Sequence, residues 1–211
     1  METSKRKLFQ TGFALSIATI LFNIIEGCVS IYFGYSDKAL TLFGFGFDSF
    51  IEAVSATGIL IMIIRIMNNT ERKSYNAEIL ALKITGSGFY ILSVGLIISS
   101  FLNIYLGKHP ESTFSGVVIS IISISIMYVL MKLKMLTGTR LSCKPIISDA
   151  NCSKVCIYMS LVLLISSLIY SVSGFKYIDS IGALGIVYFS YKEGKEAFEK
   201  VIETSSTDLN L

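Results

Sequence analysis

The sequence is poor in charge and in proline. Only 16% of its 211 residues are charged and two are proline, whereas an average soluble domain carries roughly 25% charged residues. The few charges cluster in short intervals and leave apolar stretches of about twenty residues or more, the length that crosses a bilayer core. A soluble helical protein with such stretches would lack water-facing residues to cover them. The scarcity of charge therefore argues against a soluble domain and predicts an all-α, polytopic membrane protein.

Histidine and paired cysteines are also scarce. The single histidine, His109, stands beside Pro110 in a predicted loop and is most simply solvated, so it leaves no general base near the spans and we expect no enzyme. None of the four cysteines forms a C-x-x-C pair, and the chain is too large and apolar for a disulfide scaffold. The net charge of +3 comes without a basic, aromatic-rich stripe, so no nucleic-acid partner is expected.

Six long apolar runs predict six membrane spans. Backbone polar groups in lipid must be paired within their own segment, so these runs are expected to be helices. The first run continues without a small-residue cleavage site, which favours a retained span over a secretory signal. We expect residues 1–203 to form one six-span transmembrane domain and residues 204–211 a short polar tail. The predicted spans are 8–33, 39–67, 79–106, 114–136, 145–172 and 177–198.

Basic residues are distributed unevenly between the two sides of these spans. Lys38, Lys108 and Lys176 fall on one side, and all the others that we assign fall on the side of the two termini. The positive-inside bias then places both termini in the cytoplasm, and the even number of spans agrees. The chain is rich in lysine and isoleucine and its loops are short, which suggests a plasma (inner) membrane. The residues on the terminal side are Lys5, Arg6, Lys7, Arg65, Arg72, Lys73, Lys132, Lys134, Arg140, Lys144, Lys192, Lys195 and Lys200.

Two acidic residues stand inside the second span. A charged side chain at mid-bilayer costs roughly 3 kcal/mol on insertion scales, so such residues are functional candidates. Asp48 and Glu52 are four residues apart and share one helix face. Two adjacent carboxylates repel each other unless a divalent cation or a shared proton lies between them. A pair of structural acids with ion-pair partners is the alternative.

Two cysteines show the same spacing at the start of the fifth span. Cys152 and Cys156, taken alone, are more simply small apolar packing residues. Together with Asp48 and Glu52 they can complete a tetrahedral site of two carboxylates and two thiolates, which zinc accepts. Thiolate ligands argue against magnesium, calcium and manganese, which prefer oxygen.

Several stretches resemble one family. The first span and the loop after it carry Asn23-x-x-Glu26-Gly27 and Gly34-x-Ser36-x-x-Ala39-Leu40. The second span carries Asp48 and Glu52, and the fifth carries Asp149-Ala150 ahead of Cys152 and Cys156. The sixth carries residues 177–183 and Lys192-Glu193-Gly194. In these features the chain resembles the cation diffusion facilitator family of proton-coupled divalent-metal exporters. The resemblance implies six spans, cytoplasmic termini and a metal site at Asp48, Glu52, Cys152 and Cys156. It points to a variant without the C-terminal cytoplasmic domain, similar to the transmembrane-protein-163 type.

The chain departs from the family pattern at two places. Cysteines stand at 152 and 156 where histidine and aspartate are usual, and Glu52 replaces aspartate, so the identity of the metal is open. Five further residues are candidates for accessory roles. Glu26, with Asn23 near it, could line a cavity or bond to a neighbouring helix. The accessory candidates are Asp149, Glu26, Asn23, Lys154 and Asp179.

The sequence is compatible with more than one role for Lys154 and for Asp179. Lys154 lies between the two cysteines in sequence but about 200° around the helix from their face. It could pair with Glu26, reach the interface or lower the pKa of the thiols. Asp179 stands near the end of the sixth span, where a solvated or capping role and a transport role are equally compatible with the sequence.

These features predict a transporter that exports a divalent metal from the cytoplasm in exchange for protons. Zinc is favoured, and cadmium or iron are compatible with the ligands. The metal is cargo, and no prosthetic group is expected. A homodimer is left open. Two rival functions remain: a zinc-binding membrane partner that modulates another transporter, and a proton-linked carrier of a non-metal solute.

Overall fold

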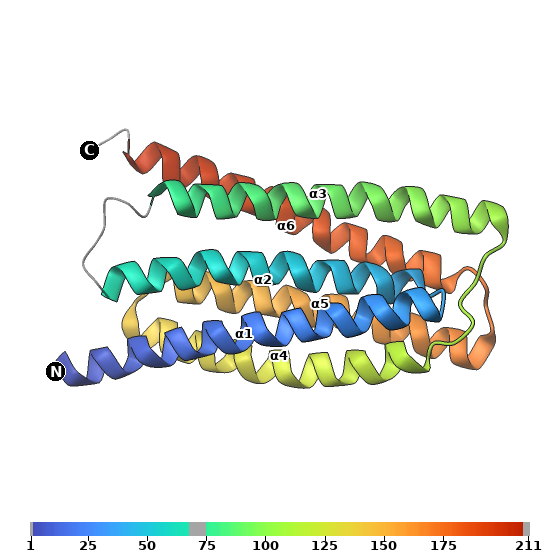
Figure 1. Cartoon of the computed structure of the whole chain (residues 1–211), viewed down its shortest axis with the longest axis horizontal. Coiled ribbons are helices and arrows are strands. Elements are labelled where there is room, and N and C mark those ends of the chain that lie inside the picture. Colours follow the sequence, from blue (N-terminus) through green and yellow to red (C-terminus); the bar gives the residue numbers. More distant parts are fainter. Residues whose placement is uncertain (1, 68–74, 209–211) are drawn as a thin grey trace.

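The chain folds into long antiparallel helices (Figure 1). The computed structural model describes residues 2–67 and 75–208, with side chains for 7–64, 79–80, 82–143 and 146–202. The all-α prediction is confirmed for these residues, and each predicted span lies within one helix or within a residue of its ends. Of the connection predicted at 68–78, residues 68–74 lie outside the described residues, as do residues 209–211 of the predicted tail. The helices are α1 Glu2–Ser36, α2 Leu40–Met67, α3 Tyr75–Leu106, α4 Phe114–Leu141, α5 Lys144–Ser173 and α6 Ile178–Asp208.

Figure 1 shows both chain termini at the same end of the bundle, which we call the terminal end. The opposite end, the loop end, holds the connections 37–39, 107–113 and 174–177. α1 packs mainly on α2, α4 on α5, and α3 on α6. α2 and α5 contact each other and both also contact α6, so these three helices surround the centre of the bundle.

Five of the described helices, α1 to α5, are long and apolar enough to cross a membrane. α6 falls short because it carries several charged residues, among them Asp179 and Glu193. Both of these side chains are buried against the other helices. α6 therefore completes the polytopic bundle with Asp179 and Glu193 facing inward.

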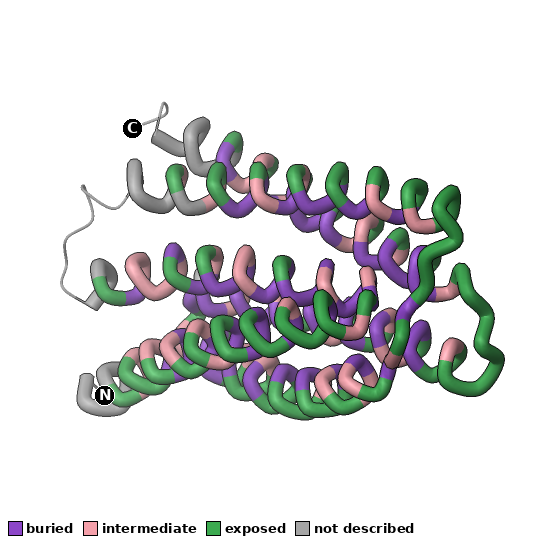
Figure 2. The backbone as a smooth tube through the Cα atoms, turned by 45° about the vertical axis from the view of Figure 1, so that its right-hand side comes forward, coloured by how far each residue is buried: buried purple, intermediate pink, exposed green. Residues whose placement is uncertain are grey.

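Burial in this protein is the reverse of that in a soluble one. Large apolar side chains such as Ile25, Ile91 and Phe101 are exposed on the outside, while Asn23 and Asp48 are fully buried. Figure 2 shows that buried stretches follow the inner faces of the helices. An outside of this kind suits lipid, in which polar groups must find partners inside the bundle.

α1 and α2 approach each other closely because glycines stand at their contact. A Cβ atom on Gly46 would lie 2.8 Å from the backbone nitrogen of Ile31, and one on Gly34 would lie 2.5 Å from that of Phe43. Small residues permit such contacts in membranes, where no hydrophobic effect drives helices together. The close approach brings the polar side chains of α1 up to those of α2.

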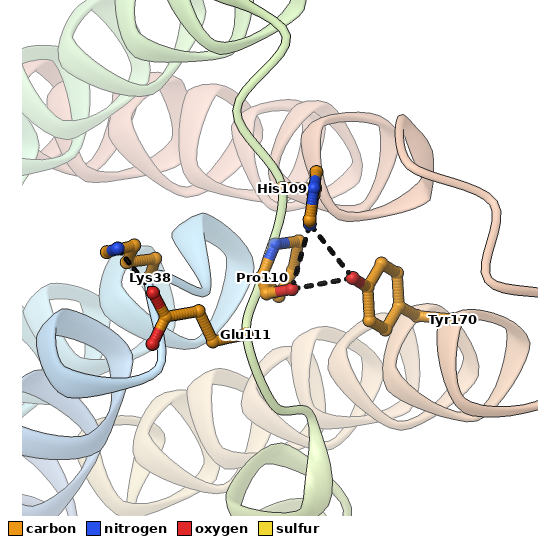
Figure 3. A network of polar contacts seen from close by, with 5 residues as sticks. All are labelled: Lys38, His109, Pro110, Glu111 and Tyr170. Atoms are coloured by element: carbon orange, nitrogen blue, oxygen red, sulfur yellow. Dashed lines mark hydrogen bonds and ion pairs between the residues drawn. The ribbon is translucent and has the colours of Figure 1, made fainter.

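The connection between α3 and α4 is held across the loop end (Figure 3). Lys38 forms an ion pair with Glu111, whose backbone N–H donates to the Asp37 carbonyl at 2.8 Å. The hydrogen bond and the charge of Lys38 lower the pKa of Glu111 from its ordinary value. His109 is exposed, as predicted, and its Nδ1 lies 3.2 Å from the Tyr170 hydroxyl. These contacts belong to the loop end and involve neither Asp48 nor Glu52.

Candidate metal site

Three of the four predicted ligands come together at the centre of the bundle. Asp48 and Glu52 of α2 and Cys156 of α5 each offer one ligand atom, and these atoms lie within 4.8 Å of one another. We call these three residues the central cluster. The Cys156 thiol donates a hydrogen bond of 2.6 Å to Glu52 Oε2. All three residues are buried, so the cluster is shielded from solvent.

Asp48 has no hydrogen-bond partner among the described groups. Neither of its carboxylate oxygens accepts a hydrogen bond from any described group, although the residue is 0% exposed. Asn23 donates from Nδ2 to Glu52 Oε2 at 3.3 Å, but its Oδ1 is likewise unpartnered within the described structure. Buried polar atoms without partners are costly. Oxygen acceptors left open beside a thiol suit a cation that binds both oxygen and sulfur.

Cys152 is not part of the central cluster. It stands one helical turn before Cys156, about 6 Å along the axis, which places it nearer the terminal end. There it lies within hydrogen-bonding reach of Glu193 of α6. Among the described residues the cluster thus contains one thiol, whereas the sequence predicted two. The role of the four residues as metal ligands stays a prediction.

A small cavity adjoins the cluster on the side of the terminal end. Glu52 is shared between the two, so the cavity leads to the cluster. Its other polar lining includes the carboxylates of Asp149 and Glu193 and the Cys152 thiol. The lining residues are Thr19, Asn23, Glu52, Ser55, Ala56, Phe89, Asp149, Cys152, Ser153 and Glu193.

Glu193 was not predicted as a site residue. It entered only as part of the stretch Lys192-Glu193-Gly194, which resembles the family. The signal was available in the periodicity of α6, because Ile186, Ser190 and Glu193 recur at helical spacing and are all buried. An acid on the buried face of a span is a functional candidate.

Of the accessory candidates on α1, Asn23 contacts the cluster directly and Glu26 lies next to it. The Ser49 hydroxyl of α2 donates to Glu26 Oε2 at 3.0 Å. This contact corresponds to the predicted alternative in which Glu26 bonds to a neighbouring helix. Asn23 and Glu26 thus tie α1 to the cluster-bearing face of α2.

Lys154 does not pair with Glu26, so that interpretation was wrong. Its side chain is exposed, with its ammonium 6.0 Å from the ring centroid of Tyr158 on the same helix. The physical reason is the angle around α5, which turns Lys154 away from the face that carries Cys152 and Cys156.

Among the described side chains, the fully buried cation is Lys134 of α4, which the sequence placed among the basic residues of the cytoplasmic side. Its ammonium lies 3.0 Å from Asp149 Oδ2 and 3.0 Å from the Ser153 hydroxyl. α4 continues to Leu141, beyond the predicted span end at 136. Lys134 therefore lies about two turns inside the helix rather than at its end.

Asp179 links α6 to the start of α2. Its carboxylate accepts hydrogen bonds from the backbone N–H groups of Leu40 at 2.6 Å and Thr41 at 3.1 Å. The first N–H groups of a helix lack partners within the helix and favour a negative charge. The capping alternative therefore describes Asp179, which does not reach the central cluster.

A helical bundle with an apolar exterior and buried acidic groups at its centre is the architecture of a multi-pass membrane protein. Residues 16–203 match the family model described as the cation efflux transmembrane domain. The chain belongs to this family, the transmembrane domain of the cation diffusion facilitators, whose substrates are divalent cations. It is a family of transporters rather than enzymes. No curated protein matches the chain.

Proposed function

We propose that this protein transports zinc and that Asp48, Glu52 and Cys156 bind the ion on its way across the membrane. The observation that carries the proposal is the unpartnered carboxylate of Asp48, buried within 4.8 Å of a second carboxylate and a thiol. The open Oδ1 of Asn23 is available as a fourth, neutral ligand. This set of oxygen and sulfur atoms suits the tetrahedral coordination of zinc. Cadmium is expected to compete because it prefers thiolates.

The ion reaches the cluster from the terminal end. The cavity lined by Asp149, Cys152 and Glu193 lies on that side and shares Glu52 with the cluster. On the other side, buried apolar residues separate the cluster from the loop end. On α2 they precede Asp48 and on α5 they follow Cys156. They are Ala39, Leu42, Phe45, Leu92, Leu96, Met159, Leu163, Ala183 and Ile186.

Release toward the loop end therefore requires this apolar layer to part. Motion of α3 and α6 relative to the other helices would do so, because the layer includes Leu96 of α3 and Ile186 of α6. With the positive-inside orientation, the terminal end is cytoplasmic and the transport direction is export. This orientation and the plasma membrane location remain part of the proposal.

The transported ion is exchanged for protons. Carboxylates and thiols bind metal only when deprotonated, so metal and protons compete for the same atoms. In this structure the Cys156 thiol donates its hydrogen to Glu52, and an arriving ion displaces that proton. Protons from the opposite side restore the bond and expel the ion.

The test is zinc uptake by the purified protein in liposomes against an imposed pH gradient, with Asp48→Asn as the inactive comparison. We expect wild-type uptake to rise with the gradient and the variant to show background uptake. Zinc binding without uptake would support the rival in which the protein modulates another transporter. Proton flux that is indifferent to zinc would support a carrier of a non-metal solute.

A further inference from the structure

Lys134 is fully buried and is paired with Asp149, a residue that lines the cavity. Its ammonium makes an ion pair with Asp149 Oδ2 at 3.0 Å and donates to the Ser153 hydroxyl at 3.0 Å. Lys134 does not itself line the cavity, whereas Asp149 and Ser153 do. The pair thus joins α4 to the wall of the cavity on α5, and the buried positive charge stands behind that wall.

Besides Glu52, which it shares with the central cluster, the cavity would otherwise hold three groups that bind cations. Asp149 and Glu193 offer carboxylates and Cys152 offers a thiol, all lining the same small space. A buried carboxylate that loses its partner must acquire a proton or another cation. Zinc and cadmium accept this combination of oxygen and sulfur. Lys134 is the group that supplies a positive charge to Asp149 instead.

We infer that Lys134 is a specificity-determining positioning residue, a resident cation that keeps Asp149 from joining Cys152 and Glu193 in a second metal site. The inference rests on the proposed function, because the consequence is that one ion passes the cavity and binds only at the central cluster. A second ion held in the cavity would be retained on the path. Lys154, on the exposed side of α5, cannot do this.

The test counts cadmium ions bound to the full-length purified chain in detergent. Equilibrium dialysis gives the number of ions, and the ultraviolet absorption of cadmium–thiolate bonds reports the number of sulfur ligands. The variants are Lys134→Gln, Lys134→Gln with Asp149→Asn, and Lys134→Gln with Cys152→Ser. Lys132→Gln is the matched control, because Lys132 is an exposed lysine two residues away on the same helix.

We expect one ion and one thiolate for wild type and for Lys132→Gln. Lys134→Gln should bind a second ion, with thiolate absorption rising about twofold because Cys152 becomes a ligand. Both double variants should return to one ion. An unchanged ion count and absorption in Lys134→Gln would overturn the inference while the single ion of wild type upholds the proposed function. If wild type binds none and Lys134→Gln binds one, the proposed function fails and the inference stands.

A folding defect in Lys134→Gln is itself informative. If the variant unfolds without metal, the inference predicts that cadmium restores its helical circular dichroism, because an ion that binds the folded state stabilises it. A purely structural role for Lys134 predicts no such rescue. Failure of cadmium to restore the fold would contradict the inference.

Discussion

Cys156 and Glu52 are joined by a hydrogen bond of 2.6 Å from Sγ to Oε2, across the contact between α5 and α2. This bond places one thiol among the buried carboxylates, while Cys152 lies one turn away beside Glu193. The two cysteines are equivalent in sequence spacing and different in surroundings. Their substitutions should therefore have unequal effects.

Replacing Cys156 should damage zinc binding far more than replacing Cys152. We expect Cys156→Ser to weaken zinc affinity tenfold or more, about 1.4 kcal/mol, because a hydroxyl is a poor ligand for a soft ion. Cys152→Ser should change the affinity by less than about threefold, under roughly 1 kcal/mol. Isothermal titration calorimetry of the two variants measures the difference. Equal losses would indicate that both thiols bind the ion.

Asp48→Asn should stabilise the metal-free protein while removing its zinc binding. The Asp48 carboxylate is buried without a hydrogen-bond partner among the described groups, and its neutral amide removes that charge from the bundle. We expect a gain of up to about 2 kcal/mol, the scale of one buried unsatisfied group. Thermal unfolding in detergent, followed by circular dichroism, measures it.

The same unfolding experiment with zinc provides the control. Zinc should raise the midpoint of wild type, because a ligand of the folded state stabilises it, and leave that of Asp48→Asn unchanged. A variant that unfolds earlier than wild type without metal would contradict the view that Asp48 is kept for binding at a cost in stability.

Asp179→Ala should destabilise the bundle without changing zinc affinity. The substitution leaves the N–H groups of Leu40 and Thr41 without their acceptor, and loss of a helix cap costs about 1 kcal/mol. Asp179→Asn keeps one acceptor and should lose less. Unfolding midpoints and zinc titrations of the two variants test this. A loss of zinc affinity in Asp179→Asn would show instead that Asp179 takes part in binding.

Substitution of Gly46, with Gly95 as the control, tests the close contact between α1 and α2. Gly46→Ala places a Cβ 2.8 Å from the Ile31 nitrogen and should cost about 1 to 3 kcal/mol, as overpacking does. Gly95→Ala on α3 meets nothing within 4 Å and should gain about 0.5 to 1 kcal/mol from a stiffer helix. Chemical unfolding of both variants is the measurement. Similar effects at the two positions would contradict the close contact.

The helices were predictable because lipid imposes a single rule on long apolar runs, which must pair their backbone groups internally. Asp48 and Glu52 were predictable for a related reason, since a charge inside a span is costly and stands out. Which of the two thiols joins the central cluster was not predictable. Two cysteines four residues apart occupy one face, and which of them meets Glu52 depends on how far α5 is shifted along α2.

Lys134 and Glu193 were missed because charged neighbours surround them in sequence. Lys132 stands two residues from Lys134, and Lys192 and Lys195 flank Glu193, so both positions resemble solvated helix ends. Only the packed bundle separates exposed Lys132 from buried Lys134. The buried charge balance of a membrane protein is set by which face of each helix turns inward, and sequence position alone does not give it.

X-ray absorption at the zinc edge of the zinc-loaded protein counts the sulfur ligands of the bound ion. We expect one sulfur ligand at about 2.3 Å with oxygen or nitrogen in the remaining positions. That sulfur should persist in Cys152→Ser and vanish in Cys156→Ser. Two sulfur ligands in the wild-type spectrum, or none, would contradict the assignment of Asp48, Glu52 and Cys156 as the site of the transported ion.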